Sequence, residues 1–150
     1  MTIMRETVLF TGKTHTAPSD GTSRAIDRRL NIETSASGSG VSQEQAFTNT
    51  LPHPTAEQLF AGAWSACYSG AIMLSSQELK MKLPPDLAVE VEIDLVMVTA
   101  DDYHIRARFN VIVPGATHEA AEALAHRAHE TCPYSKATKG NIDVEVKVTV

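Results

Sequence analysis

The sequence predicts an α+β fold in a single domain, residues 1–150. Three observations lead to this: a long, nearly uncharged stretch at residues 55–77 that favours a helix, two neighbouring segments at 87–97 and 103–113 that alternate apolar and polar residues, and a third alternating segment at 142–150. Helices and antiparallel strands in separate parts of one chain are typical of α+β proteins. A chain of 150 residues is long enough for one domain with its own core.

The stretch from residue 55 to residue 77 has the sequence TAEQLFAGAWSACYSGAIMLSSQ and carries no charge after its third residue. Thr55 and Gln58 have the spacing of a capping box, which predicts a helix start. The pattern allows the helix to run on to Lys82, before Pro84 and Pro85 stop it. Because apolar residues occupy every face, we expect this helix to be buried in a core or an interface.

The elements before this helix are predicted from composition. Residues 6–17 are rich in β-branched and aromatic residues and predict a strand. Residues 24–33 predict a second strand, which would complete an N-terminal β-hairpin. Residues 34–54 are rich in Ser, Gly, Thr and Pro, and we expect a long loop there.

The elements after the helix follow clear periodicities. Residues 87–97 and 103–113 predict an antiparallel hairpin, in which the acids of one strand face the arginines of the other on the solvent side. Thr117 is placed to cap a helix that runs to about Cys132, where Pro133 ends it. Residues 142–150 alternate again and predict a last strand.

Charge and composition exclude several classes of function. The net charge is −5 and no cluster of Lys and Arg is present, so we expect no nucleic-acid partner. Met1–Thr7 is polar and no apolar segment follows it, so we expect no signal peptide. The Ser and Gln residues within 55–77 argue against a membrane span. Two cysteines without an export signal indicate a reducing, cytoplasmic location, where paired thiols are more often catalytic or redox-active than structural.

The two cysteines are the strongest candidates for chemistry. Cys67 and Cys132 lie 65 positions apart, so the spacing alone leaves two alternatives: unrelated buried thiols, or an attacking and a resolving thiol that the fold brings together. His126 and His129 precede Cys132 at helical spacing, but no recognised metal motif results. We expect solvent-exposed histidines, no metal and no cofactor.

Two long motifs, each with one cysteine, resemble those of a known family. CPYSKATKGNIDV, which begins at Cys132, resembles the C-terminal signature of the organic hydroperoxide resistance (Ohr) proteins of the Ohr/OsmC superfamily. TAEQLFAGAWSACY, which contains Cys67, resembles the other signature of that family, and VLFTGKTHTA near the N-terminus also fits. The resemblance therefore covers nearly the whole chain.

This resemblance implies a thiol peroxidase that acts on organic and fatty-acid hydroperoxides. Cys67 matches the peroxidatic position, Cys132 the resolving position, and Glu57 the glutamate that, with an arginine, positions and activates the thiolate. The family's reductant is a lipoyl group on a lipoylated protein. Its fold is an intertwined homodimer with buried central helices.

Two features bear on this expectation. Glu57 lies ten residues before Cys67, about 15 Å along one straight helix, so either the helix breaks near its start or Glu57 serves the Cys67 of a partner chain; we favour the dimer. Ser19 stands where the family has its arginine, and Arg24, Arg28 or Arg29 are the possible substitutes. Two alternatives therefore remain open: an OsmC-branch peroxidase with another peroxide preference, and a non-catalytic sensing or binding relative.

Overall fold

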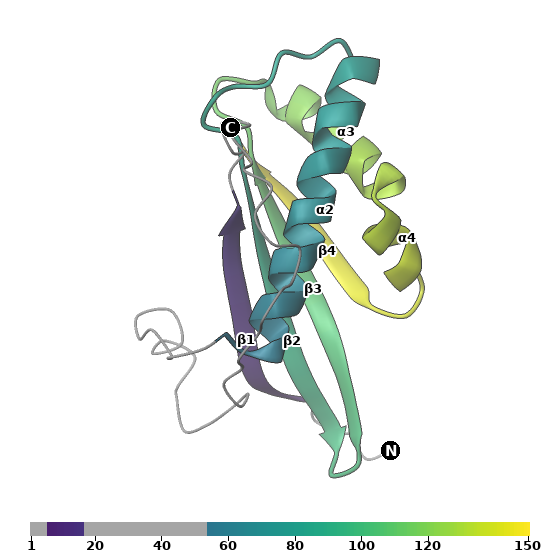
Figure 1. The fold of residues 1–150 in the computed structure, drawn as a ribbon. Helices are drawn as coiled ribbons and strands as arrows, with labels where there is room; N and C mark the ends of the chain where they lie inside the picture. Colours follow the sequence, from purple (N-terminus) through teal and green to yellow (C-terminus); the bar gives the residue numbers. More distant parts are fainter. Residues whose placement is uncertain (1–5, 17–53) are drawn as a thin grey trace, which may run out of the picture.

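A computed structural model describes residues 6–16 and 54–150 of the chain (Figure 1). Four strands form one sheet in the order β1-β2-β3-β4. β1, β2 and β3 are antiparallel neighbours, and β4 runs parallel to β3. The strands are β1 (Thr7–Thr16), β2 (Ala88–Thr99), β3 (Asp102–Ile112) and β4 (Asp143–Thr149).

These strands confirm the α+β class, the first strand, the central hairpin and the last strand. The predicted second strand at 24–33, and residues 34–53 of the predicted loop, lie outside the described residues. That residues 1–150 form one domain stays a prediction.

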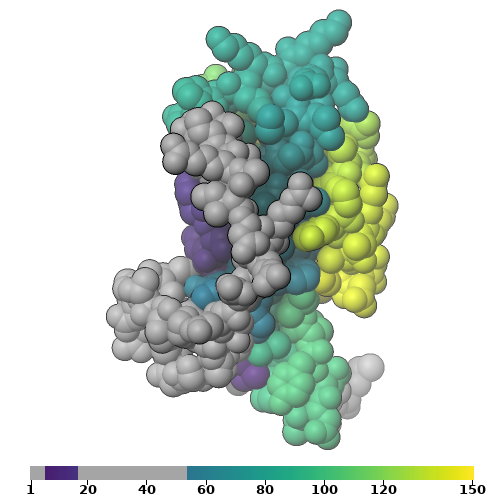
Figure 2. Space-filling view, viewed as in Figure 1, coloured from purple at the N-terminus to yellow at the C-terminus, as the bar shows by residue number. Residues whose placement is uncertain are grey.

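The helices lie on one face of the sheet. They are α2 (Ala56–Glu78), α3 (His118–Thr131) and the short α4 (Pro133–Thr138). α2 crosses the sheet with α3 beside it (Figure 1). The core fills the layer between helices and sheet, and its largest fully buried side chains include Trp64, Tyr68, Ile72, Val89, Val91, Ile93, Phe109, Val111 and Leu124. The tip of the β2–β3 hairpin extends beyond the helical layer (Figure 2).

Charged residues cover the opposite face of the sheet, as the alternation predicts. Glu92 pairs with Arg108 in the register of β2 and β3, and Asp94 pairs with Arg106. Arg108 donates to Glu92 at 2.9 Å and to Asp94 at 2.9 Å, and Lys13 of β1 lies 3.2 Å from Glu92. The prediction that acids face arginines across this hairpin is confirmed.

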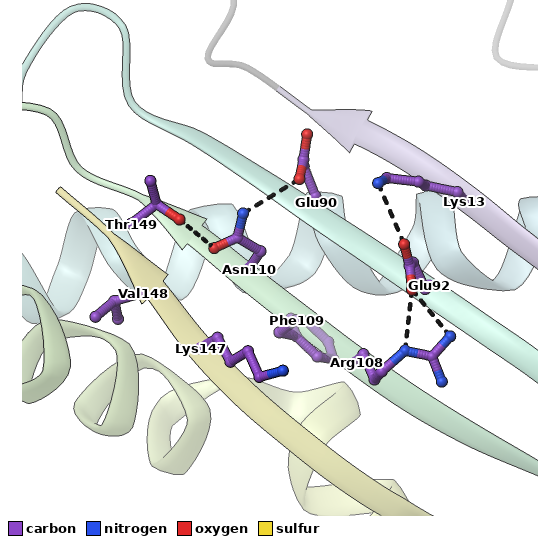
Figure 3. Close-up of a pocket in the computed structure, with 9 residues that line it drawn as sticks. All are labelled: Lys13, Glu90, Glu92, Arg108, Phe109, Asn110, Lys147, Val148 and Thr149. Carbon is purple, nitrogen blue, oxygen red and sulfur yellow. Dashed lines mark hydrogen bonds and ion pairs between the residues drawn. The ribbon is translucent and has the colours of Figure 1, made fainter. Parts of the chain in front are cut away.

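A pocket lies in the middle of this charged face (Figure 3). Its polar side chains bond mainly to one another: Asn110 donates to Glu90 at 3.2 Å and accepts from Thr149 at 2.8 Å. Neither cysteine lines it. We interpret this face as a solvated ion network, because its charges are matched within the sheet, and place the candidate site on the helical side.

α2 begins where predicted and ends earlier than predicted. Thr55 is the N-cap and forms the capping box with Gln58 in both directions. The helix does not run on to Lys82, because Lys80 takes a left-handed conformation with φ of 52°. The backbone N–H groups of Lys80 and Met81 then bond back to the carbonyls of Gln77 and Ser76, which is a Schellman termination with lysine at the position where glycine is usual.

α3 matches its prediction, and α4 was not predicted. Thr117 caps α3 through its side chain, which accepts from Ala120 N–H, and Cys132 is the C-cap. Pro133 does end α3, but it also occupies the first position of α4. Proline suits that position because its fixed φ is helical and its missing N–H is not needed there.

None of the helices within residues 54–150 combines the length and hydropathy that a bilayer crossing requires.

Candidate active site

The fold brings the two cysteines together. The Sγ–H of Cys132 donates to Sγ of Cys67 across 3.4 Å, although the residues lie 65 positions apart. Both thiols are free, Cys67 is partly exposed and Cys132 is fully buried. A disulfide needs an S–S distance of about 2.05 Å, so a small shift of one side chain would bring the two sulfurs to the distance at which an oxidant could join them.

Each cysteine is positioned by a different part of the helical layer. Cys67 lies in the middle of α2. Cys132 is the joint between α3 and α4, with φ of −62° and ψ of 121°. Its backbone N–H still bonds to the carbonyl of Ala128, and its own carbonyl accepts from Lys136 N–H. The extended joint turns the Cys132 side chain out of the helical repeat and towards α2.

The surroundings of Cys67 favour the neutral thiol. Burial is the largest cause that raises its pKa above the ordinary value, and the hydrogen bond and charge of Cys132 raise it further. The backbone N–H of Tyr134 donates to Cys67 and lowers the pKa, without reversing the shift. No cationic side chain of residues 6–16 or 54–150 is among the groups that shift it. This part of one chain therefore does not activate the thiol.

Aromatic side chains surround the pair on the core side. Trp64, one turn before Cys67, stacks edge-on against Phe109 with ring centroids 5.0 Å apart, and Tyr68 lies 4.9 Å from the same ring. Trp64 and Tyr68 are fully buried, as expected of core residues beside the site. Tyr134, two residues after Cys132, is 46% exposed.

Glu57 is not brought to Cys67 within one chain. α2 is continuous from Ala56 to Glu78, so the alternative in which the helix breaks near its start is excluded. Glu57 is buried in the first turn, where α2 meets Gly12 of β1. A Cβ atom on Gly12 would lie 2.7 Å from the carbonyl carbon of Glu57 and 2.8 Å from its Cβ. The close approach of β1 and α2 fixes the position of Glu57 in the core.

Comparisons with known proteins decide the family. The family model described as OsmC-like protein matches residues 47–147. The chain belongs to the OsmC family.

Relatives and solved structures agree with this OsmC assignment. The chain is 31% identical over 121 residues to an organic hydroperoxide resistance protein of Xanthomonas axonopodis pv. citri, which covers 81% of this chain and 78% of that one. The crystal structure of OhrB of Bacillus subtilis is 32% identical, with a TM-score of 0.60 over 73% of this chain and 79% of that one. An organic hydroperoxide resistance protein from Elizabethkingia anophelis is 26% identical, with a TM-score of 0.64 over 93% of this chain and 94% of that one.

The structure of this OsmC protein does not describe every predicted site residue, and it shows features near the cysteine pair that the sequence did not predict. Ser19 and the arginines at 24, 28 and 29 lie outside the described residues. Within residues 6–16 and 54–150, no three His, Cys, Asp or Glu side chains are grouped as a metal site would require. The short helix α4 and the Tyr134 N–H contact were missed. Pro133 was the signal for α4, because proline marks helix starts as well as helix ends.

His129 corrects the expectation of exposed histidines. It is half-buried against Tyr68 and Phe109, and its Nδ1 atom is buried with no hydrogen-bond partner among the described residues. Burial lowers its pKa, and the nearby charges of His126 and Lys139 lower it further. The folded protein therefore holds His129 neutral at pH values where the unfolded chain protonates it.

Because of His129, the free energy of unfolding should fall as the medium becomes acidic. The folded state binds fewer protons than the unfolded state. The contribution of His129 to the free energy of unfolding is therefore complete above the unfolded pKa of about 6.5 and is lost as pH falls below it. Urea unfolding at about pH 7.5 and about pH 5.5 measures this change. The free energy of unfolding should fall more between the two pH values for the wild type than for His129→Phe, which keeps the ring packing. His118→Gln is the control, because His118 is exposed and is not among the groups that shift the pKa of His129, and it should behave as the wild type. Equal losses in wild type and His129→Phe would contradict the assignment.

Proposed function

We propose that the protein is a Cys-based thiol peroxidase that reduces organic hydroperoxides, of the fatty-acid type, to alcohols. The observation that supports this most is the 3.4 Å approach of Cys67 and Cys132, two free thiols held by separate helices. The names of the relatives, organic hydroperoxide resistance proteins, support the class of substrate. The apolar and aromatic side chains beside Cys67 suit a greasy peroxide.

In the proposed reaction, the Cys67 thiolate attacks one oxygen of the O–O bond. That bond breaks, the sulfur keeps one oxygen as a sulfenic acid, and the other oxygen leaves as an alkoxide that takes a proton. The Cys132 thiol then attacks the sulfenic sulfur, which forms the disulfide and releases one water. A dithiol, such as a lipoyl group on a lipoylated protein, reduces the disulfide by thiol–disulfide exchange. A reducing cytoplasm would maintain that dithiol.

Activation of Cys67 is proposed to need a second copy of the chain. The raised pKa of Cys67 requires a stabilising group that residues 6–16 and 54–150 of one chain do not supply. A continuous α2 separates Glu57 from Cys67 in the same chain. We therefore assign Glu57 to the Cys67 of the partner chain in a homodimer. One of the arginines at 24, 28 and 29 is the candidate for the accompanying cation.

An apolar stripe on α2 supports the homodimer. The side of the helix that faces away from the sheet (Figure 1) carries exposed apolar residues along its length. Met73 is 55% exposed, Leu74 56% and Phe60 37%. Ala63, Ala66 and Gly70 continue the stripe between them. A contiguous exposed apolar surface of this kind marks a contact site, and it accounts for a helix with apolar residues on every face.

A charge in this stripe should separate the subunits. Leu74→Glu is expected to raise the dimer dissociation constant by about 100-fold, because the carboxylate would be desolvated in the contact. Sedimentation equilibrium measures this directly. Leu79→Glu is the control, since Leu79 is exposed but lies at the C-cap beyond the end of the stripe. A wild type that is monomeric yet fully active would contradict the shared site.

Repeated turnover separates the enzyme from a sensor. The sensing alternative is favoured by the raised pKa of Cys67, which slows attack. With an excess of a dithiol such as dihydrolipoamide, the proposed enzyme consumes many equivalents of a bulky organic hydroperoxide per chain. A sensor oxidises once and stops. Comparing a bulky organic hydroperoxide with hydrogen peroxide in the same assay distinguishes an Ohr preference from that of an OsmC-branch enzyme.

A further inference from the structure

Two buried hydrogen bonds flank the cysteine pair. On α2, Trp64 lies three residues before Cys67, and its indole Nε1–H donates to Oγ of Ser135 at 3.0 Å. Tyr68 lies one residue after Cys67, and its hydroxyl donates to the carbonyl of Ala125 at 2.6 Å. Trp64 and Tyr68 are fully buried and Ser135 is 3% exposed. Both bonds run from α2 to the chain segment that carries the second thiol.

We propose that Trp64 and Ser135 are positioning residues for the resolving step. Their hydrogen bond holds the turn from Cys132 to Ser135 against α2, so that the Cys132 thiol stays within reach of Cys67. This inference rests on the proposed function. It adds to that function a pair of residues that touch neither substrate nor reductant.

The short helix depends on this bond for its position. α4 has only six residues, and its N-cap, Cys132, makes no side-chain capping bond. A helix of this length is not stable by itself in water, so contacts with the rest of the protein must fix it. Ser135 is the single buried residue of α4, and its hydroxyl accepts from Trp64. A buried N–H···O bond sets both distance and direction, whereas apolar contact sets neither.

The same turn supplies the second contact to Cys67. The backbone N–H of Tyr134, the residue before Ser135, donates to the Cys67 sulfur. The bond from Trp64 therefore holds two groups on Cys67 at once: the thiol that resolves it and the one N–H of the described residues that lowers its pKa. Trp64 and Cys67 are nearly one turn apart on α2, so the indole that donates to Ser135 and the reacting Cys67 sulfur move together.

The position of the turn decides the fate of the Cys67 sulfenic acid. With Cys132 in place, the sulfenic acid and the Cys132 thiol form the disulfide and one water. With the turn displaced, a second hydroperoxide reaches the sulfenic acid, which takes up its oxygen to become a sulfinic acid while the hydroperoxide leaves as the alcohol. The hydrogen bond is thus expected to favour the disulfide over irreversible oxidation.

A thiol–disulfide equilibrium tests the proposal without any hydroperoxide. The protein is equilibrated with mixtures of reduced and oxidised dithiothreitol, and the Cys67–Cys132 disulfide is quantified by intact mass. Trp64→Phe removes the donor and keeps a buried ring, and Ser135→Ala removes the acceptor. Each should lower the equilibrium constant for the disulfide about tenfold, the scale of one lost buried hydrogen bond. The double variant should lower it no further, since the two residues act as one unit.

Ser65→Ala is the matched control. Ser65 is buried on α2 beside Trp64, and its hydroxyl lies 2.6 Å from that of Thr16 on β1, away from the Cys132 turn. This variant loses a buried hydroxyl contact on the same helix and should keep the wild-type constant within about twofold. Equal constants for Ser135→Ala, Ser65→Ala and the wild type would overturn the proposal, even if Trp64→Phe does not fold.

A hydroperoxide titration gives the second readout. Trp64→Phe and Ser135→Ala should accumulate Cys67 sulfinic acid, a gain of two oxygen atoms, at lower hydroperoxide concentrations than the wild type and Ser65→Ala. A protein that does not react with hydroperoxide fails the proposed function, yet its disulfide equilibrium still reports on the positioning pair. The two failures are therefore distinguishable.

Discussion

Cys67→Ser is expected to lower the rate of hydroperoxide reduction by about 10⁴-fold or more, because a serine hydroxyl is not ionised at neutral pH and does not replace a thiolate nucleophile. Cys132→Ser should act differently. It keeps the attacking thiol, so one equivalent of hydroperoxide is still consumed, but the sulfenic acid on Cys67 has no thiol to resolve it. The prediction is checked by following hydroperoxide loss in excess dithiol and by trapping the sulfenic acid with dimedone.

The two variants should differ because the two thiols differ in exposure. Cys67 is partly exposed and Cys132 is fully buried, so only the first is accessible to a bulky substrate. Dimedone should therefore label Cys132→Ser at Cys67 and should not label Cys67→Ser. If Cys67→Ser kept the wild-type rate, or if the two variants lost the first reaction equally, the assigned roles would be wrong.

Gly12→Ala is expected to lower the free energy of unfolding by about 3 kcal/mol, the upper end for adding a methyl group to a packed site. A Cβ atom at residue 12 would lie 2.6 Å from the backbone N of Gln58 and 2.7 Å from the carbonyl carbon of Glu57. Both are backbone atoms of the first turn of α2, which has no flexible end to move aside. Urea unfolding monitored by circular dichroism measures the loss.

Gly62→Ala is the matched control for this prediction. Gly62 lies on the same helix, and the nearest atom to an added Cβ there is Thr14 Cγ2 at 3.9 Å, an ordinary contact. Alanine in a helix interior is favoured over glycine by about 1 kcal/mol, so this variant should be as stable as the wild type or more so. Gly12 also fixes the position of Glu57. Gly12→Ala should therefore reduce activity by more than the loss of folded protein explains. Equal stability of the two alanine variants would contradict the close approach.

Local patterns in the sequence predicted most of the described fold. The capping box at Thr55 and the alternation at 87–97 and 103–113 each act over a few residues, and the elements formed as expected. The end of α2 was not predictable in the same way, because Lys80 takes a left-handed conformation that glycine or asparagine normally signals. α4 was not predicted, because a proline can mark the end of one helix and the start of the next, and Pro133 does both.

The candidate site was also predictable only in part from the sequence. The resemblance of two motifs singled out Cys67 and Cys132, and their 3.4 Å approach depends on a joint between two helices that no periodicity reveals. The spacing of Glu57 and Cys67 left two alternatives, a helix that breaks near its start or a partner chain, and the continuous α2 excludes the first. The bond between Trp64 and Ser135 joins residues 71 positions apart, and such pairings appear only in the folded chain.

One measurement tests the central claim most directly. Reduced protein is mixed without oxygen with one equivalent of a bulky organic hydroperoxide, and thiol content and intact mass are followed from milliseconds to seconds. The account predicts rapid loss of both thiols, a mass lower by two hydrogen atoms, one equivalent of alcohol, and no reaction in Cys67→Ser. Thiols that survive for minutes in the wild type would contradict the peroxidase assignment and leave a pocket protein whose cysteines serve another chemistry.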